Sequence, residues 1–353
     1  MRIERQGDAD RTGRCECGPR GEEAGGVTAA DATDLPAVSV VIPAYNAGRY
    51  LERAVESALA QTGIGCLQVV IVDDCSTDAT AKVIAECAAR YPDQITALSN
   101  PQNMGPAGSR NRGIAAATGD WIAVLDADDA LAPGRLARLI GVAEAEGVDV
   151  IADLLVFFDL AANAVEEAQP ACSGAVQRLV IEDFLRPDAE SGLDLGLLKP
   201  VFRRDLAQRR VWRYPDGVRH AEDLALYVSV LRKGVDFALL REAHYLFSTR
   251  VGARSGRFSP GSVTAVNYNS VADQTEALRD EMRQAGDISP GLAQVFEDRI
   301  VRLRRQNRIY GWTVLRKGEV RRLMSWLRAD TRNRQDLFAV IGQKLRGRRG
   351  LPE

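Results

Sequence analysis

The sequence predicts an α/β fold in which helices flank both faces of a mostly parallel β-sheet. Short runs of β-branched and other apolar residues alternate with segments whose apolar residues recur at helical spacing. The short runs are apolar throughout, which is typical of parallel strands that are buried on both faces. Carboxylates and turn residues follow several of these runs. In such sheets, ligands bind beyond the carboxyl ends of the strands.

The strands and helices of this fold can be placed in chain order. Four strands are predicted, namely VSVVIP (38–43), LQVVIVDD (67–74), ITALSN (95–100) and WIAVLD (121–126). Helices are predicted between them, namely RYLERAVESALAQ (49–61), STDATAKVIAECAARY (76–91) and GSRNRGIAAAT (108–118). Ser76 and Asp78 are candidate caps of the second helix. Loops that leave the first, second and fourth strands should therefore converge on one crevice.

Length and composition fit a globular protein with one large domain and an appendage. The chain has 353 residues, of which 46% are apolar and 27% are charged. The most apolar segment, 148–165, contains three aspartates, so we expect no membrane span there. Residues 1–35 are polar and glycine-rich without an apolar signal core, and we expect a disordered leader. We expect a cytoplasmic protein whose six cysteines are all reduced.

Charge is distributed unevenly along the chain. Residues 299–353 hold 16 Lys and Arg against 4 Asp and Glu, a net charge of +12, although the whole chain carries −2. From about residue 262 onward the pattern is helical, and Trp326 lies among Arg321, Arg322 and Arg328. Because no aromatic platform or zinc-finger spacing accompanies the basic residues, we expect no nucleic acid partner. The alternatives are peripheral contact with an anionic membrane and a solvated helix face.

Three carboxylates in IAVLDADDAL (122–131) follow the fourth strand directly. A dinucleotide site would need GxGxxG after the first strand, where the chain has PAYNAGRY, and the phosphate loop GxxxxGK[ST] is also absent. Carboxylates can hold a diphosphate only through a divalent cation such as Mg²⁺ or Mn²⁺. Alternation along an extended segment would point Asp126 and Asp128 to the same side, where they could share that cation. The alternative is that the acids cap the following helix, a role that suits Asp129.

Four motifs in this order make the chain resemble a known enzyme family. PAYNAGRYLERAVESALAQT, VVIVDDCSTDAT, NMGPAGSRNRG and VLDADD resemble the nucleotide-sugar-binding half of family 2 inverting glycosyltransferases, which have the GT-A fold. The segments LDLGLLKPVFRR, VRHAEDLALYVSVLRKG and HYLFSTRVGARSG look like the acceptor half of bacterial exopolysaccharide transferases of the succinoglycan type. The resemblance covers about residues 36–260. It implies a GT-A domain at 36–261, divided at 130 into a donor half and an acceptor half, and followed by a helical basic region at 262–353.

The resemblance also implies a nucleoside site. Pro43, Tyr45 and Asn46 would border the nucleoside. Asp74, with Asp73 behind it, would accept a hydrogen from the base edge, and the base would most often be uracil.

The remaining donor residues follow from the third and fourth motifs. Asn103 and Arg110 would complete the nucleoside and phosphate side, and Asn111 would brace the loop. Asp128 would be the main metal ligand, and Asp126 would reach the ribose or the metal through water. The cation would neutralise the departing nucleoside diphosphate. The alternative for Asn103 and Arg110 is a helix cap and a solvated arginine.

An inverting transfer also needs a base on the acceptor side of the sugar. In the motif RHAED, the resemblance places this base at Asp223, while Glu222 and His220 are the alternatives. Arg219 and His220 could hold acceptor oxygens or tune the carboxylate. The same acids could instead begin an amphipathic helix, where the macrodipole favours them.

Lys199 and Arg250 are candidates for the far side of the diphosphate, although isolated basic residues are more often surface charges. The predicted activity is therefore transfer of a sugar from a nucleoside diphosphate sugar to an acceptor hydroxyl with inversion. The expected acceptor is lipid-linked or part of a growing exopolysaccharide or cell-surface glycan. The alternatives are a soluble small-molecule acceptor and an inactive scaffold that binds the sugar nucleotide.

Overall fold

The computed structural model describes residues 35–160, 164–165, 173–189, 191–216, 221–249 and 268–347, with backbone alone at 249 and 343–347. These residues form two compact units. The first unit contains the described residues up to Leu179, with 198–216 and 235–249. The second contains the described residues of 180–197, with 221–234 and 268–347. The predicted leader and the boundary predicted at residue 261 lie outside the described residues, apart from Leu35.

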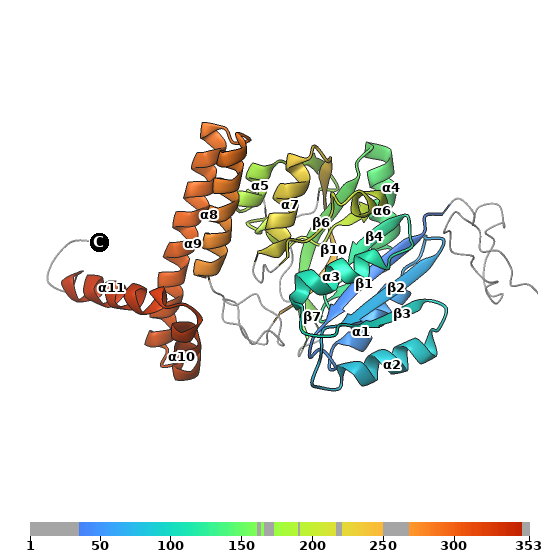
Figure 1. The fold of residues 1–353 in the computed structure, drawn as a ribbon, viewed down its shortest axis with the longest axis horizontal. Helices are drawn as coiled ribbons and strands as arrows, with labels where there is room; N and C mark the ends of the chain where they lie inside the picture. The colour runs from blue at the N-terminus through green and yellow to red at the C-terminus, as the bar shows by residue number, and fades with distance from the viewer. Residues whose placement is uncertain are drawn as a thin grey trace, which may run out of the picture. The chain divides into compact units, whose positions relative to one another are not determined.

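The first unit is built on one sheet (Figure 1). Its strands are β1 (Val38–Ala44), β2 (Leu67–Asp73), β3 (Ile95–Ser99), β4 (Trp121–Val124), β5 (Ala130–Leu131), β6 (Val150–Asp159), β7 (Ala164–Val165), β8 (Val176–Arg178), β9 (Val201–Arg203) and β10 (Phe237–Thr249). Their order is β3-β2-β1-β4-β9-β6-β10-β5, and β7 and β8 pair with β6 and β10. The pairs among β3, β2, β1 and β4 are parallel, as is β6 with β10, whereas β9 is antiparallel to both neighbours.

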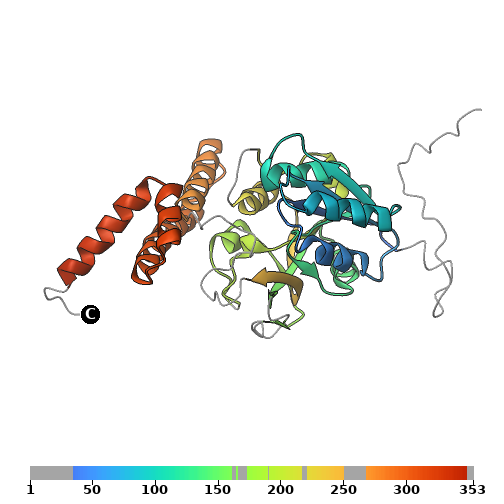
Figure 2. The same cartoon turned by 90° about the horizontal axis from the view of Figure 1, so that it is seen from below.

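Helices cover both faces of this sheet (Figure 2). The helices of the first unit are α1 (Leu51–Leu59), α2 (Thr80–Arg90), α3 (Gly105–Ala115), α4 (Arg135–Glu146) and α6 (Arg204–Gln208). From β1 to β3 the chain moves outward in one direction, and from β3 to β4 it returns across β2 and β1. Because such crossovers are right-handed, α1 and α2 lie on one face and α3 lies on the other. A Cβ at Gly113 would lie 2.4 Å from Val41 Cγ1, so only glycine lets α3 approach β1 this closely.

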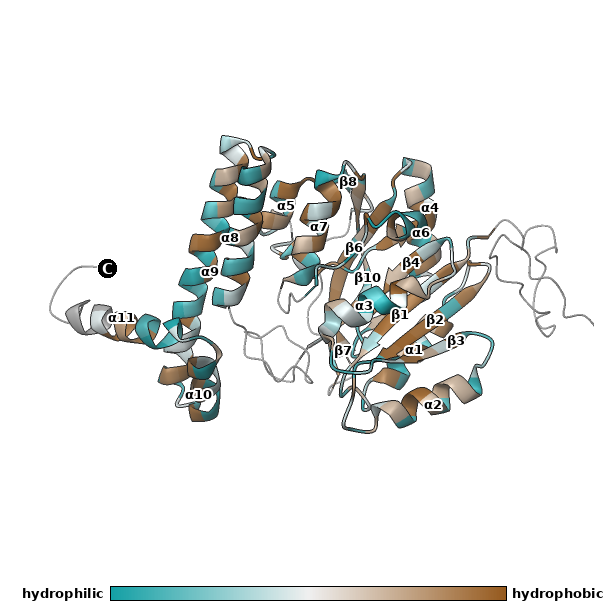
Figure 3. Cartoon of the chain, viewed as in Figure 1, coloured by the Kyte–Doolittle hydropathy of each residue, from teal (hydrophilic) through white to brown (hydrophobic). Residues whose placement is uncertain are grey.

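The predicted α/β class and mostly parallel sheet are confirmed, and hydropathy explains the arrangement. The central strands β1, β2 and β4 are almost entirely buried, as the continuous apolar runs predicted. Figure 3 shows these strands as mostly hydrophobic, whereas the helices carry both kinds of residue. The apolar segment at 148–165 contains β6, which lies inside the sheet. Among the described residues, no helix is long and apolar enough to cross a bilayer.

The second unit consists of helices. They are α5 (Ile181–Leu185), the 3₁₀ helix η1 (Leu195–Leu197), α7 (Glu222–Arg232), α8 (Tyr268–Ala285), α9 (Pro290–Arg316), α10 (Val320–Ala329) and α11 (Arg332–Gly347). Helices α8 and α9 pack through Ala272, Ile300 and Leu303. Where α9 meets α10, Gly311 faces the ring of Trp326, and the ring Nε1 donates to Asn307 Oδ1.

One prediction about the cysteines is wrong. Cys66 is disulfide-bonded, whereas Cys75 and Cys87 are free thiols. Spacing along the chain did not reveal this bond, because pairing depends on which thiols the fold brings together.

Candidate donor site at the strand ends

The loops that follow β1 and β2 are tied together by side-chain hydrogen bonds. Asn46 Oδ1 accepts from Thr77 N at 2.8 Å, and Asn46 N donates to Ser76 Oγ at 3.0 Å. Asp78 Oδ2 accepts from Gly48 N, which joins the first loop to the start of α2. Asn46 has a φ of 50°, a left-handed conformation that asparagine adopts more readily than most residues. These bonds therefore fix the loop that was predicted to border a nucleoside.

Two other members of the predicted nucleoside site lie at the end of β1 and directly after it. Pro43 is half-buried inside β1, and Tyr45 directly follows the strand with 53% of its surface exposed. An exposed aromatic ring at a strand end can stack on a base.

Asp74 organises the start of α3. Its Oδ1 accepts from Asn100 Nδ2 and from Met104 N, both at 2.7 Å, and its Oδ2 accepts from Gly105 N at 2.9 Å. Asn103 Nδ2 donates to the Asp74 carbonyl oxygen. An ionised carboxylate offers about four acceptor positions. Within the described part of the chain, three of them are used, so Oδ2 can accept one more donor.

Asp73 lies at the end of β2 and is also buried. Its Oδ1 accepts from Ser76 N at 3.2 Å, so it shapes the turn after the strand. The two neighbouring aspartates therefore hold two different loops in place.

Asp126 lies between two cations. Arg110 Nη2 is 2.7 Å from Asp126 Oδ1, and Lys199 Nζ is 3.3 Å from Asp126 Oδ2. Burial alone would raise the pKa of Asp126, but the charges of Lys199 and Arg110 hold it well below its usual range. Arg110 also lies over the Tyr214 ring, 5.3 Å from its centroid. The structure thus brings Arg110, Asp126 and Lys199 together.

The predicted geometry of the acidic segment is only partly correct. Strand β4 ends at Val124, two residues earlier than expected, and Asp129 N donates to the Asp126 carbonyl oxygen in a turn. The extended alternation that was to place Asp126 and Asp128 on one side is therefore absent. Asp128 is half-buried, and burial followed by the nearby charge of Asp126 raises its pKa to about 7.

Asp129 is not a helix cap, contrary to that alternative. It is buried, its Oδ2 accepts from Tyr245 Oη at 2.8 Å, and its Oδ1 accepts from Ser248 N at 2.8 Å. The next helix, α4, is capped instead by Gly134. Tyr245 Oη also accepts from Asp126 N at 3.1 Å. Asp129 therefore fastens the acidic turn to β10.

The donor set around Asp128 fits a divalent cation in part. Carboxylate oxygens are hard ligands of the kind that Mg²⁺ and Mn²⁺ prefer. Within the described part of the chain, no three Asp, Glu, His or Cys side chains gather closely enough to hold a metal alone. A cation at Asp128 would therefore need oxygens from a bound ligand, as is common for Mg²⁺ with phosphates.

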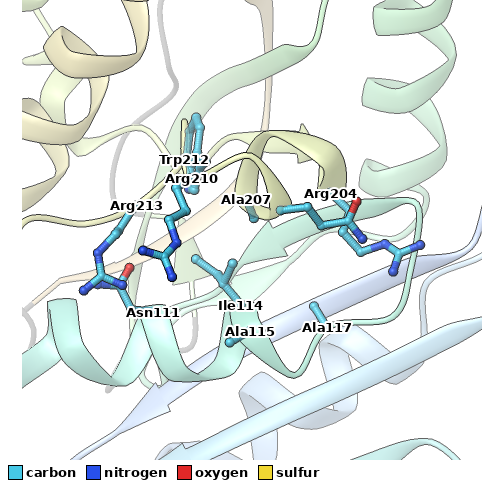
Figure 4. Close-up of a pocket in the computed structure, with 10 residues that line it drawn as sticks. Asn111, Ile114, Ala115, Ala117, Arg204, Ala207, Arg210, Trp212 and Arg213 are labelled. Carbon is cyan, nitrogen blue, oxygen red and sulfur yellow. The ribbon is translucent and has the colours of Figure 1, made fainter. Parts of the chain in front are cut away.

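Asn111 braces a segment that is distant in sequence. Its Nδ2 donates to the Tyr214 carbonyl oxygen and its Oδ1 accepts from Tyr214 N, both at 2.9 Å. Beside this brace lies a pocket of about 400 Å³ (Figure 4). Ile114 of α3 and Ala207 of α6 line it, and Arg204, Arg210 and Arg213 border it. The carboxylates described above do not line this pocket.

The predicted base residues lie in the second unit. Glu222 and Asp223 form the first turn of α7, and Asp223 is buried. Ala221, which precedes them, has a φ of 57°. That left-handed conformation costs an L-residue roughly 1–2 kcal/mol. Arg219, His220 and Arg250 lie outside the described residues.

Sequence reasoning did not find Arg53, Tyr245 and Ser248. Arg53 lies in α1, 75 residues before Asp128, yet its Nη1 reaches the Asp128 carbonyl oxygen at 3.3 Å. The only available signal was a polar residue inside an amphipathic helix, which is ordinarily a solvated position.

The strand order and the acidic turn define the class of the fold, which is GT-A, the fold of nucleotide-diphospho-sugar transferases. Residues 39–183 match the family model of glycosyl transferase family 2. The chain therefore contains a glycosyl transferase family 2 domain, as the resemblance predicted.

Curated relatives support this assignment. The chain is 36% identical over 224 residues to the succinoglycan biosynthesis protein ExoO of Rhizobium meliloti (strain 1021), a match that covers 63% of each protein. It is 34% identical over 235 residues to ExoU of the same organism, covering 65% of this chain and 66% of that protein. The chain thus spans just under two thirds of the length of these relatives.

Solved structures with the same fold include two ligand complexes. TarS 1–349 of S. aureus, in complex with UDP-GlcNAc, has a TM-score of 0.56 at 19% identity and covers 75% of this chain and 71% of that one. The mannosyltransferase PcManGT of Pyrobaculum calidifontis, in complex with GDP-Man and Mn²⁺, has a TM-score of 0.51 at 17% identity and covers 89% and 88%. At these identities the likeness establishes the fold alone.

Proposed function

We propose that this protein transfers a sugar, with inversion, from a UDP-sugar to a hydroxyl of a lipid-linked or growing exopolysaccharide. The observation that carries this proposal is the cluster of Arg110, Asp126 and Lys199 beside the Asp128 turn. Arg110, Asp126 and Asp128 lie within the residues that match the family 2 model, and Lys199 joins them from the segment that follows. Two cationic side chains, together with a carboxylate after β4 that would bind a divalent ion, suit a diphosphate, which carries several negative charges.

The donor nucleotide would lie along the loops that follow β1, β2 and β4. Tyr45 would stack on the base, and Asp74 Oδ2 would accept from the uracil N3–H, for which it has an acceptor position left. Pro43, Asn46 and Asn103 would shape the nucleoside side, with Asp73 holding the turn behind it. Arg110 and Lys199 would face the diphosphate, with Asp126 between them fixing both side chains.

Asp128 would hold a Mg²⁺ or Mn²⁺ ion together with the diphosphate oxygens. When bound, the ion supplies Lewis-acid stabilisation of the leaving group. In the transfer, the acceptor oxygen forms a bond to the anomeric carbon as the bond from that carbon to the phosphate oxygen breaks. The electron pair of the broken bond goes to the nucleoside diphosphate.

The acceptor proton needs a base, and Asp223 is our proposal for it. Burial suits this role, because it keeps bulk water away from a carboxylate that must act on one positioned hydroxyl. The strained conformation of Ala221, directly before the two acids, also supports a functional position, because such strain concentrates at active sites. Glu222 is the alternative base, and Arg219 and His220 would assist.

The proposed acceptor also gives the basic second unit a role. Val320 and Met324 are exposed one turn apart on α10, beside the exposed Arg321 and Arg322. Exposed apolar residues flanked by arginines suit the surface of an anionic membrane. We propose that α10 brings the enzyme to a lipid-linked acceptor at the inner face of the cytoplasmic membrane.

A panel of nucleotide sugars tests the proposed function directly. Each sugar nucleotide is incubated with the protein, with Mn²⁺ or with EDTA, and the release of nucleoside diphosphate is measured. We expect release from a UDP-sugar that depends on Mn²⁺. Release from none of the donors, or equal release in EDTA, would contradict the proposal.

A further inference from the structure

The carbonyl oxygen of Asp128 accepts hydrogen bonds from two side chains. Arg53 Nη1 donates to it at 3.3 Å, and Ser248 Oγ donates to it at 2.5 Å. Arg53 Nη1 also lies 3.1 Å from Ser248 Oγ. The backbone of Asp128 is thus held by α1 and by the end of β10 at the same atom. Because the carbonyl and the side chain belong to one residue, fixing the first restricts the direction of the second.

Arg53 itself is held in place from a third element. Its guanidinium carbon lies over the Phe158 ring of β6, 4.8 Å from the ring centroid. Burial lowers the pKa of Arg53, and the neighbouring carboxyl groups of Asp129 and Asp128 oppose this by favouring its charged form. Arg53 is therefore oriented by packing and charge before any ligand is present, which is what a precisely placed carboxylate requires.

This arrangement is unfavourable for stability. Arg53 Nη2 is buried and has no hydrogen-bond partner within the described part of the chain. A buried donor without a partner costs stability, and an apolar side chain of similar volume often costs less. A residue that departs from the best choice for stability is expected where function requires it. Arg53 should therefore matter more for the site than for the fold.

We propose that Arg53 is a positioning residue of the donor site, which fixes the Asp128 main chain and so aims its carboxylate at the cation and diphosphate. This inference rests on the proposed function, because it assumes that Asp128 holds a divalent ion. It assigns to Arg53 no contact with the sugar or the acceptor. Replacing Arg53 should therefore change the gain in UDP affinity that Mn²⁺ provides, and it should leave the UDP affinity in EDTA unchanged.

Calorimetric titration of UDP tests this inference on the full chain. Each variant is measured with Mn²⁺ and with EDTA, and the ratio of the two affinities reports the contribution of the metal. Arg53→Met keeps much of the apolar volume and removes the donors. Arg90→Met is the matched control, because Arg90 contacts α1 through Glu52 from an exposed position. Thermal unfolding of every variant reports stability.

We expect Arg53→Met to lower the affinity ratio about tenfold, as the loss of one charge-assisted hydrogen bond would do. The affinity in EDTA should stay at the wild-type value, and the Tm should not fall, because Met removes a buried donor that has no partner among the described residues. Arg90→Met should leave the affinity ratio, the affinity in EDTA and the Tm unchanged. An unchanged ratio in Arg53→Met would overturn the inference. A ratio that falls together with the Tm would also overturn it, because Arg53 would then be merely structural.

Asp128→Asn separates this inference from the proposed function. If Asp128→Asn abolishes the metal dependence while Arg53→Met preserves it, Arg53 is not a positioning residue and the proposed function stands. If wild-type protein binds UDP equally with Mn²⁺ and with EDTA, the proposed metal site fails, and the inference about Arg53 fails with it.

Discussion

Arg110 and Asp126 form an ion pair of 2.7 Å that joins α3 to the turn after β4. The arginine side chain is almost completely buried, whereas a quarter of the Asp126 side chain is exposed. The pair therefore fixes the orientation of the Arg110 guanidinium beside Asp126.

Replacing Arg110 by Met should weaken nucleotide binding. The substitution leaves Asp126 with Lys199 as its only close cation among the described residues, so an anionic ligand meets a more negative site. We expect the Kd for UDP, measured by calorimetry, to rise about tenfold or more. Arg138→Met is the control, because Arg138 pairs with Glu242 at an exposed position on α4. Equal affinities of Arg110→Met and wild type would contradict the role of this pair.

Asp128→Asn should remove the metal dependence of nucleotide binding. Asparagine keeps the shape of the side chain but loses the charge that a divalent ion requires. The affinity for UDP with Mn²⁺ should fall to the value in EDTA. Asp120→Asn, at an exposed carboxylate just before β4, serves as the control. Persisting stimulation by Mn²⁺ in Asp128→Asn would mean that the ion is held elsewhere.

Asp223→Asn should separate chemistry from binding. If Asp223 takes the acceptor proton, the amide removes the base, and kcat should fall roughly a hundredfold to ten-thousandfold. The affinity for UDP should stay nearly unchanged. Glu222→Gln is the matched variant from the same helical turn. Wild-type kcat in Asp223→Asn together with a loss in Glu222→Gln would assign the base to Glu222.

The buried pair of Arg135 and Asp153 should make stability depend on pH. Both side chains are fully buried, with Nη2 and Oδ1 2.7 Å apart. Burial raises the pKa of Asp153, but the charge of Arg135 and the hydrogen bonds from His244 and Arg135 together outweigh it, so the folded pKa lies below the unfolded value of about 3.8. The pair therefore contributes stability above that pH, and the contribution is lost as the pH falls through the folded pKa.

Asp153→Asn tests this dependence through urea unfolding at several pH values. At pH 7 we expect a loss of about 3–5 kcal/mol in the free energy of unfolding, because Arg135 stays buried without a counter-charge. The difference from wild type should shrink below pH 4. Asp236→Asn, which breaks an exposed pair with Arg178, should cost under about 1 kcal/mol. A difference that is independent of pH would contradict the assignment.

The arginines of α10 should carry membrane binding. We expect replacement of Arg321, Arg322 and Arg328 by Gln to weaken binding to vesicles that contain phosphatidylserine by about a hundredfold, at about 1 kcal/mol per charge. Sedimentation with anionic and neutral vesicles, at low and high salt, measures this. The control changes three exposed arginines of the first unit, Arg90, Arg138 and Arg209. Equal losses in both triple variants would indicate a dependence on net charge alone.

The sequence was sufficient to predict the first half of the sheet, because its strands are nearly pure apolar runs and its helices are amphipathic. β1 to β4 and the three helices between them lie within a few residues of their predicted positions. The reversed strand β9 was not predicted, because three residues between a proline and a helix carry too little periodicity to signal a strand.

For the candidate site, the sequence predicted which residues lie together but not the contacts that each one makes. The position of a carboxylate after a strand indicated that it lies near the other strand-end residues, but it did not indicate its hydrogen-bond partners. Asp129 follows the same strand as Asp126 and Asp128, yet it bonds to Tyr245 and Ser248, more than a hundred residues later in the chain. Such long-range partners depend on tertiary packing, which a pattern of neighbouring residues does not contain.

The reversed direction of β9 explains how Lys199 reaches Asp126. Because β9 runs antiparallel to β4, with Ala123 opposite Val201, the residues just before β9 lie beside the residues just after β4. Side chains alternate between faces along such a segment, so inserting or deleting one residue between Lys199 and Val201 would turn the ammonium to the opposite side. Related proteins that keep this cluster should therefore tolerate substitutions in this short connection while conserving its length, and a change in length should coincide with the loss of the lysine.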